Sequence, residues 1–103
     1  MLPSEISDSL LQRLEEQYRD TVTVSSVKAV SGGSINSAFY IRCNIGDFFL
    51  KYNYSESFPG MFRAETIGLI TLDSCRCIRV PRVIHWANTG IYSYLLLEYL
   101  HPG

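Results

Sequence analysis

The most constraining feature of the sequence is a stretch of alternating side chains that is interrupted once by a turn. Phe39, Ile41 and Cys43 alternate with more polar neighbours, which is the two-residue period of a β-strand. Segment 44–47, Asn-Ile-Gly-Asp, has the residue types of a short hairpin connection. It leads into the run Phe-Phe-Leu-Lys-Tyr-Asn at 48–53. The pattern predicts two antiparallel strands joined by a tight turn.

The other segments predict three more strands and two helices. β-Branched residues predict a strand over 21–30. Segments 80–86 and 91–99 predict two more strands, the first at a sheet edge because Pro81 removes a ladder donor. Apolar residues at helical spacing predict one helix that Ser4 caps and another over 61–73. We expect an α+β fold with a mainly antiparallel five-stranded sheet, a crossing helix and an N-terminal helix alongside.

Composition limits the classes of function. The 103 residues, of which 47% are hydrophobic, predict one globular domain, 1–103. A net charge of -1 gives no general attraction to nucleic acid or to an anionic membrane. The sequence has neither a signal peptide pattern nor an apolar run long enough to span a membrane, which predicts a cytoplasmic protein.

Three cysteines, Cys43, Cys75 and Cys77, fit neither a zinc site nor a disulfide framework. They are interpreted as structural thiols, with a reactive surface thiol at 75–77 as the alternative. His85 and His101 have no carboxylate or serine at catalytic spacing and are interpreted as structural or surface residues. We expect no catalytic residue and no metal ligand in the chain.

A pair of glycines stands between the first two predicted strands. Gly32 and Gly33 permit backbone conformations in which successive N–H groups face a phosphate oxygen. Double-glycine turns are also ordinary hairpin chemistry. Both interpretations stay open on this feature alone.

Lys51 occupies an unusual position for a charged residue, inside an apolar strand. Strand alternation places Phe49, Lys51 and Asn53 on one face. An aromatic surface for a planar base beside a cation for phosphate oxygens suits a nucleoside triphosphate. The alternative is that Lys51 reaches into solvent from a half-exposed face.

Glu65 falls on the apolar side of its predicted helix, three residues after Phe62 and four before Leu69. A carboxylate buried there needs a cation. Lys51 is the nearest partner expected from the sheet, and the competing cations are the arginines at 63, 76, 79 and 82. A large separation between Lys51 and Glu65 would favour an unrelated small α+β ligand-binding domain.

The segment 95–100, Leu-Leu-Leu-Glu-Tyr-Leu, is nearly continuously apolar and is followed by His-Pro-Gly. It is either a central buried strand or a strand that runs into a hinge whose backbone can bind an adenine edge. We expect its apolar end to be exposed, which suggests a homodimer as one use of the chain.

Taken in order, these segments resemble the N-terminal small lobe of the fructosamine kinase (ketosamine kinase) family, which has a protein-kinase-like fold. The matching segments are Gly-Gly-Ser-Ile-Asn at 32–36, Phe-Phe-Leu-Lys-Tyr-Asn at 48–53, Met-Phe-Arg-Ala-Glu-Thr-Ile-Gly-Leu at 61–69, Val-Pro-Arg-Val at 80–83 and Leu-Leu-Glu-Tyr-Leu at 96–100.

The resemblance implies ATP-dependent phosphorylation of a sugar hydroxyl on glycated amines or protein lysines, which supports deglycation. It implies that Lys51 contacts nucleotide phosphates, that Glu65 orients Lys51, and that the backbone from Glu98 to Leu100 contacts adenine. The residues implied for the phosphate loop are Gly32, Gly33, Ser34 and Asn36.

The same resemblance implies a large lobe that carries an aspartate base and a magnesium aspartate, and neither aspartate is recognisable in these 103 residues. Phosphoryl transfer depends on positioning with metal and base. We therefore expect ATP and Mg²⁺ as the family's cofactors but an inactive isolated chain. The alternative function is a non-catalytic assembly module that dimerises through its hinge-side apolar surface.

Overall fold

The computed structural model describes residues 2–30, 37–57, 59–75 and 79–100. Within these ranges the chain forms two helices and five strands. The elements are α1 (Ser4–Tyr18), β1 (Val24–Val30), β2 (Ser37–Cys43), β3 (Gly46–Tyr54), α2 (Met61–Cys75), β4 (Val83–Thr89) and β5 (Tyr92–Glu98). The strands form one sheet in the order β1-β2-β3-β5-β4, and every neighbouring pair is antiparallel. The predicted α+β fold is confirmed.

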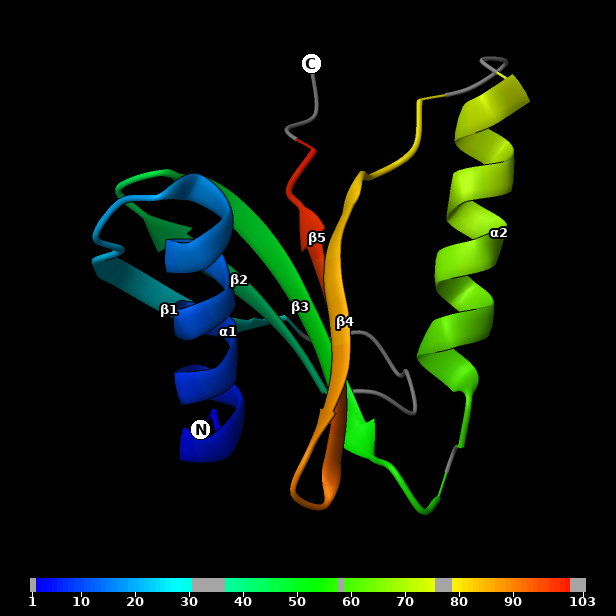
Figure 1. The fold of residues 1–103 in the computed structure, drawn as a ribbon, viewed down its shortest axis with the longest axis horizontal. Helices are drawn as coiled ribbons and strands as arrows, with labels where there is room; N and C mark the ends of the chain where they lie inside the picture. The colour runs from blue at the N-terminus through cyan, green and yellow to red at the C-terminus, as the bar shows by residue number, and fades with distance from the viewer. Residues whose placement is uncertain (1, 31–36, 58, 76–78, 101–103) are drawn as a thin grey trace.

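The two helices cover opposite faces of the sheet (Figure 1). Alternation along β3 explains this arrangement, because Phe48 and Leu50 pack in the cluster that contains α1, whereas Phe49 packs against the cluster that contains α2. Each face of this central strand therefore belongs to a different layer.

The α1 layer is the larger of the two. Ile6, Leu10 and Leu14 recur every four residues on α1 and are at most 2% exposed. They pack against buried residues of β2, β3 and β5. The prediction that Ser4 caps this helix is wrong, because Pro3 is the capping position and the Ser4 hydroxyl donates to Glu5 Oε1 at 3.1 Å.

The β2–β3 hairpin is tighter than predicted. Cys43 pairs with Gly46, so only residues 44 and 45 form the turn. The Asn44 side chain bridges to the segment before β1, donating to the Thr21 carbonyl at 2.7 Å and accepting from the Thr23 N–H at 2.8 Å. Because the Thr21 carbonyl and the Thr23 N–H bond to this side chain, they do not pair with a neighbouring strand. The strand β1 accordingly begins at Val24 rather than Thr21.

β4 is an edge strand, as predicted, but it begins at Val83, after Pro81. β5 lies between β3 and β4, and Leu95, Leu96 and Leu97 are at most 4% exposed. The expectation of an exposed apolar strand end is therefore wrong for these three residues, because the chain itself covers them on both faces. Neither helix in the described ranges has the length and apolarity needed to cross a bilayer.

Candidate functional site

The predicted partner of Lys51 lies beside it. Lys51 extends from the middle of β3 toward α2, and its Nζ donates to Glu65 Oε2 at 2.7 Å. The side chains are 28% and 29% exposed, respectively. Glu65 therefore lies at the flank of the buried stripe rather than within it, and the buried positions of α2 are Phe62 and Thr66. The close pair removes the argument for an unrelated ligand-binding domain.

Phe49 and Asn53 flank Lys51 on the same face of β3. Phe49 is partly buried against the cluster of Phe62, Leu95 and Leu97. Asn53 is 6% exposed, and its Nδ2 donates to Met61 Sδ at 3.2 Å. Met61 begins α2, so this bond attaches the first turn of the helix to the strand that carries Lys51.

Asn53 is a residue whose role the sequence did not reveal. The alternation of β3 places it on the Lys51 face, but no pattern in the sequence indicates that it contacts the helix start. Met61 precedes Glu65 by four residues, which is about one helical turn. The Asn53–Met61 contact therefore lies one turn before the carboxylate that Lys51 binds.

The strand residues on either side of the β1–β2 connection lie at the level of Lys51 in the sheet. Ala38 of β2 pairs with Val30 on one side and with Lys51 on the other. The predicted phosphate-loop residues Gly32, Gly33, Ser34 and Asn36 belong to this connection and lie outside the described residues. The register nevertheless brings Val30 and Ser37, the described residues that flank this connection, to within one register position of Lys51.

The backbone at the end of β5 is held by two neighbouring segments. Glu98 N–H donates to the Arg82 carbonyl at 2.9 Å, and Tyr99 N–H donates to the Asp47 carbonyl at 3.1 Å. The Glu98 carboxylate accepts from the Arg82 N–H at 3.2 Å. Because Leu97 faces α2, alternation directs the Glu98 side chain toward the α1 layer and away from the Lys51 face.

Glu98 lies three register positions from Lys51, since Lys51 pairs with Leu95 on β5. This is about 10 Å at the rise of a strand. Leu100, the last described residue, is partly buried. Lys51 and the end of β5 therefore lie on adjoining strands of one sheet, and Glu65 contacts Lys51 from α2.

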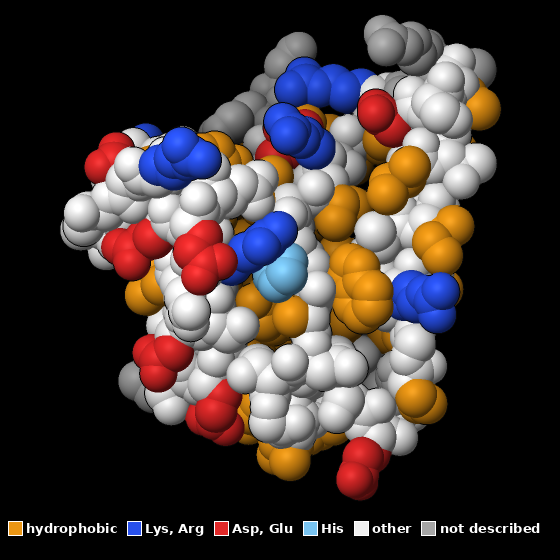
Figure 2. Space-filling view, viewed as in Figure 1, with side chains coloured by type: hydrophobic (Ala, Val, Ile, Leu, Met, Phe, Trp, Pro, Cys, Tyr) orange, Lys and Arg blue, Asp and Glu red, His pale blue; other side chains and the backbone are white. Residues whose placement is uncertain are grey.

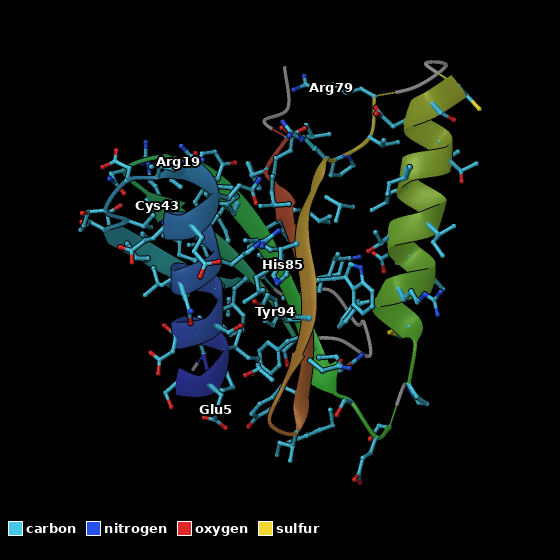
Figure 3. The ribbon with its side chains drawn as sticks, viewed as in Figure 1. Glu5, Arg19, Cys43, Arg79, His85 and Tyr94 are labelled. Atoms are coloured by element: carbon cyan, nitrogen blue, oxygen red, sulfur yellow. The ribbon has the colours of Figure 1, made fainter. Side chains whose placement is uncertain are left out.

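The histidine and cysteine positions lie away from this site. His85 and Tyr94 lie between the sheet and α1 (Figure 3), with their ring centroids 5.8 Å apart. Cys43 is buried, which raises the pKa of its thiol, and Cys75 is exposed. His101 and Cys77 are outside the described residues. Among the described residues, no group of three or more His, Cys, Asp or Glu side chains could hold a metal ion.

The five-stranded antiparallel sheet, the helix crossing one face and the strand lysine paired with a helix glutamate together define the small lobe of a kinase-like fold. The fructosamine kinase family model matches residues 6–103. The chain belongs to the fructosamine kinase family.

Individual relatives agree with this assignment. The chain is 34% identical over 89 residues to the "Probable ketoamine kinase" of Klebsiella aerogenes. The matched region covers 86% of this chain and 31% of that protein. It is 37% identical over 83 residues to "Protein-ribulosamine 3-kinase, chloroplastic" of Arabidopsis thaliana, covering 78% and 24% of the two sequences.

A solved structure supports the same conclusion. The crystal structure of a candidate fructosamine-3-kinase from Haemophilus somnus 129PT superposes with a TM-score of 0.79 and 31% identity, over 91% of this chain and 32% of that chain. The chain therefore spans about a third or less of the length of these relatives.

Proposed function

We propose that the chain is the N-terminal nucleotide-binding lobe of a fructosamine or ketosamine kinase. The observation that carries this proposal is the 2.7 Å contact between Lys51 Nζ and Glu65 Oε2, which joins β3 to α2. A carboxylate that holds a lysine ammonium in one position prepares the cation to contact nucleotide phosphates.

The nucleotide would lie along the α2 face of the sheet. Its phosphates would be bound by Lys51 and by the β1–β2 connection that carries Gly32, Gly33, Ser34 and Asn36, and its base would lie toward Phe49. The N–H groups of Glu98 and Tyr99 already donate within the fold. The adenine edge would therefore use the Glu98 carbonyl oxygen and the Leu100 N–H.

ATP fits the residues described so far, because a half-buried cation and a partly buried aromatic share one strand face. For Mg²⁺ the described residues offer no cluster of carboxylates. We propose that the metal ligands and the catalytic base belong to a large lobe, which accounts for the remaining length of the relatives. Under this proposal the 103 residues form one small lobe and do not transfer phosphate on their own. We place the protein in the cytoplasm.

The reaction we assign to the whole enzyme is ATP-dependent phosphorylation of the sugar of glycated amines or protein lysines. The names of the relatives, a ketoamine kinase and a ribulosamine kinase, support this substrate class. Dimerisation through Leu95–Leu97 is not favoured as a second function, because these side chains are buried within the chain.

The test of the nucleotide site is a titration of the chain with Mg²⁺-ATP, followed by amide chemical shifts. We expect saturable shifts in β3 and α2, and Lys51→Ala should weaken binding at least about tenfold, as loss of a charge-assisted contact implies. Lys28→Ala is the matched control, because Lys28 is the other lysine of the chain and lies on β1. Equal ATP affinity of the Lys51→Ala variant and the parent chain would contradict the proposal.

The predicted inactivity has a separate test. Incubation of the chain with a fructosyl-amine, ATP and Mg²⁺ should produce no ADP above the background of a reaction without protein. Sustained turnover by this chain would show that the base and metal ligands do not require a second lobe.

A further inference from the structure

One flank of α2 leaves apolar side chains in water next to the edge strand β4. Ile67 and Ile70 on α2 are 56% and 59% exposed, and Trp86 on β4 is 37% exposed. Trp86 pairs with Leu95 across the sheet, and Leu95 packs in the α2 layer, so Trp86 faces α2. Figure 2 shows hydrophobic side chains gathered between β4 and α2, with Lys or Arg side chains beside and above them.

In the described part of the chain, two hollows lie along this boundary between α2 and β4, called the seam below, and each is lined by residues of both elements. The upper hollow, about 260 Å³ in volume, is lined by Leu69, Ile70 and Asp73 on α2 and by residues 81–83 on the other side. The lower hollow, about 160 Å³, includes Arg63 and Trp86 in its lining. Pockets for small molecules usually measure about 300–1,000 Å³. Each hollow is therefore better matched to a side chain of a protein partner than to a metabolite.

The spacing of the hollows indicates the form of the partner. Arg63 and Ile70, which mark the two hollows, are seven residues apart on α2, a rise of about 10 Å. Two apolar side chains seven residues apart on a docked helix have the same separation. An amphipathic helix that lies along a groove is a common mode of peptide recognition.

The charges around the seam indicate the sign of the partner. Arg63 lines the lower hollow and Arg82 the upper one, and Asp73 is the acidic side chain that lines the upper hollow. The seam is thus locally positive although the chain as a whole has a net charge of -1. Complementary charge steers encounter and selects the correct partner.

We propose that this seam, formed by Ile67, Ile70, Arg63, Trp86 and Arg82, is the docking site of an acidic amphipathic helix from a partner protein. The partner helix places one apolar side chain in each hollow, and its carboxylates lie near the two arginines. This assignment extends beyond the proposed kinase function and does not depend on it.

The seam is separate from the nucleotide site because the two lie on opposite flanks of α2. At about 100° per residue, Arg63 and Ile70 lie about 80–100° to one side of Phe62, whereas Glu65 lies about 60° to the other side. Phe62 marks the buried direction, since it is 2% exposed. A docked helix would therefore leave Glu65 with its partner Lys51.

Trp86 provides a direct test, because it is the single tryptophan of the chain. The probe is a synthetic helical peptide of about 18 residues, which is long enough for helix formation. It carries two leucines seven positions apart, which enter the hollows, and glutamates at the positions that do not. A twin peptide with lysine in place of glutamate is the charge control. We expect the acidic peptide to shift the Trp86 emission to the blue with saturation at sub-millimolar concentration, and the basic twin to bind at least about tenfold more weakly.

Substitutions on α2 separate docking from other effects. Ile70→Ser should weaken the acidic peptide about tenfold or more, and Arg63→Glu should reverse the preference between the two peptides. Leu72→Ser is the matched control, because Leu72 is 46% exposed on the same helix but lines neither hollow. Because Ile70, Arg63 and Leu72 are exposed, these variants should fold as the parent does.

Several outcomes would overturn the docking site. They are the absence of a saturable Trp86 shift, equal affinity for both peptides, and unchanged affinity in Ile70→Ser. A Trp86 shift that depends on protein concentration without peptide would show that a second copy of the chain occupies the seam instead. The Lys51→Ala variant should lose ATP binding and keep the Trp86 titration of the parent chain, so the two proposals can fail independently.

Discussion

Lys51 and Glu65 each retain more than a quarter of their side-chain surface in solvent, at 28% and 29%. Water screens an ion pair with this exposure, and pairs of this kind contribute about 0–1 kcal/mol to folding. The pair therefore has little effect on whether the chain folds. Its consequence is geometric, since it fixes where the ammonium group of Lys51 lies relative to the sheet.

His85 is the residue through which mild acid should act on the fold. Burial lowers its pKa from the usual 6.5, and the nearby charge of Arg13 lowers it further. The unfolded chain therefore binds a proton more readily than the folded chain, and the stability associated with neutral His85 is present above about pH 6.5 and lost as the pH falls toward the lower folded pKa.

We predict that the free energy of unfolding in urea decreases between pH 7.5 and pH 5.5. The variant His85→Gln should show a smaller decrease, because it lacks the titrating imidazole beside Tyr94. Parallel pH profiles for the parent chain and His85→Gln would contradict this role of His85.

At the scale of elements, the turn between β2 and β3 depends on one backbone conformation. Gly46 has φ +144°, a value that side-chain-bearing residues rarely adopt, and a Cβ added there would meet no atom within 4 Å. Any cost of substitution at this position therefore comes from the backbone rather than from a clash.

We predict opposite effects for two Gly→Ala substitutions. Gly46→Ala should lower the free energy of unfolding by about 1 kcal/mol or more, because alanine does not fit a positive φ. Gly68→Ala should raise it by about 0.5–1 kcal/mol, because Gly68 is an exposed position inside α2 with open space around it. Chemical denaturation of the two variants checks both signs, and destabilisation by Gly68→Ala would be the contrary result.

Side-chain alternation and helical spacing predicted the strands and helices because neighbouring residues determine both patterns. Alternation from Phe39 to Asn53 was sufficient to assign Lys51 to one face of β3, and helical spacing was sufficient to direct Glu65 toward that face. The Ser4 cap failed because Pro3 already supplies the helix start. Element starts depend on such neighbouring residues and are the part that patterns locate least well.

Features that depend on the order of strands were not accessible from the sequence. The end of β5 was expected to be exposed, but β5 is a central strand whose two faces are covered, Leu96 by the α1 layer and Leu95 and Leu97 by the α2 layer. The contact between Asn53 and Met61 also depends on where the chain places α2 after the loop that follows β3. No periodicity encodes either arrangement, because both follow from long-range packing.

At the scale of the whole molecule, the two layers on the sheet differ in how much apolar surface they bury. The cluster under α1 joins three α1 side chains to buried residues of β2, β3 and β5. Among the described residues, the buried part of the cluster under α2 consists of Phe62, Leu95 and Leu97. The layer that carries Glu65 is therefore the more weakly packed of the two.

The weaker packing of the α2 layer has a consequence for local opening of the folded chain. Segments with few buried apolar contacts exchange their amide hydrogens through openings that cost less than global unfolding. The amides of α2 should therefore exchange faster than those around Ile6, Leu10 and Leu14 in α1. Hydrogen exchange followed by NMR would measure the difference, and equal protection of the two helices would contradict it. Fluctuations that separate Glu65 from Lys51 should then take place while α1 and the sheet remain folded.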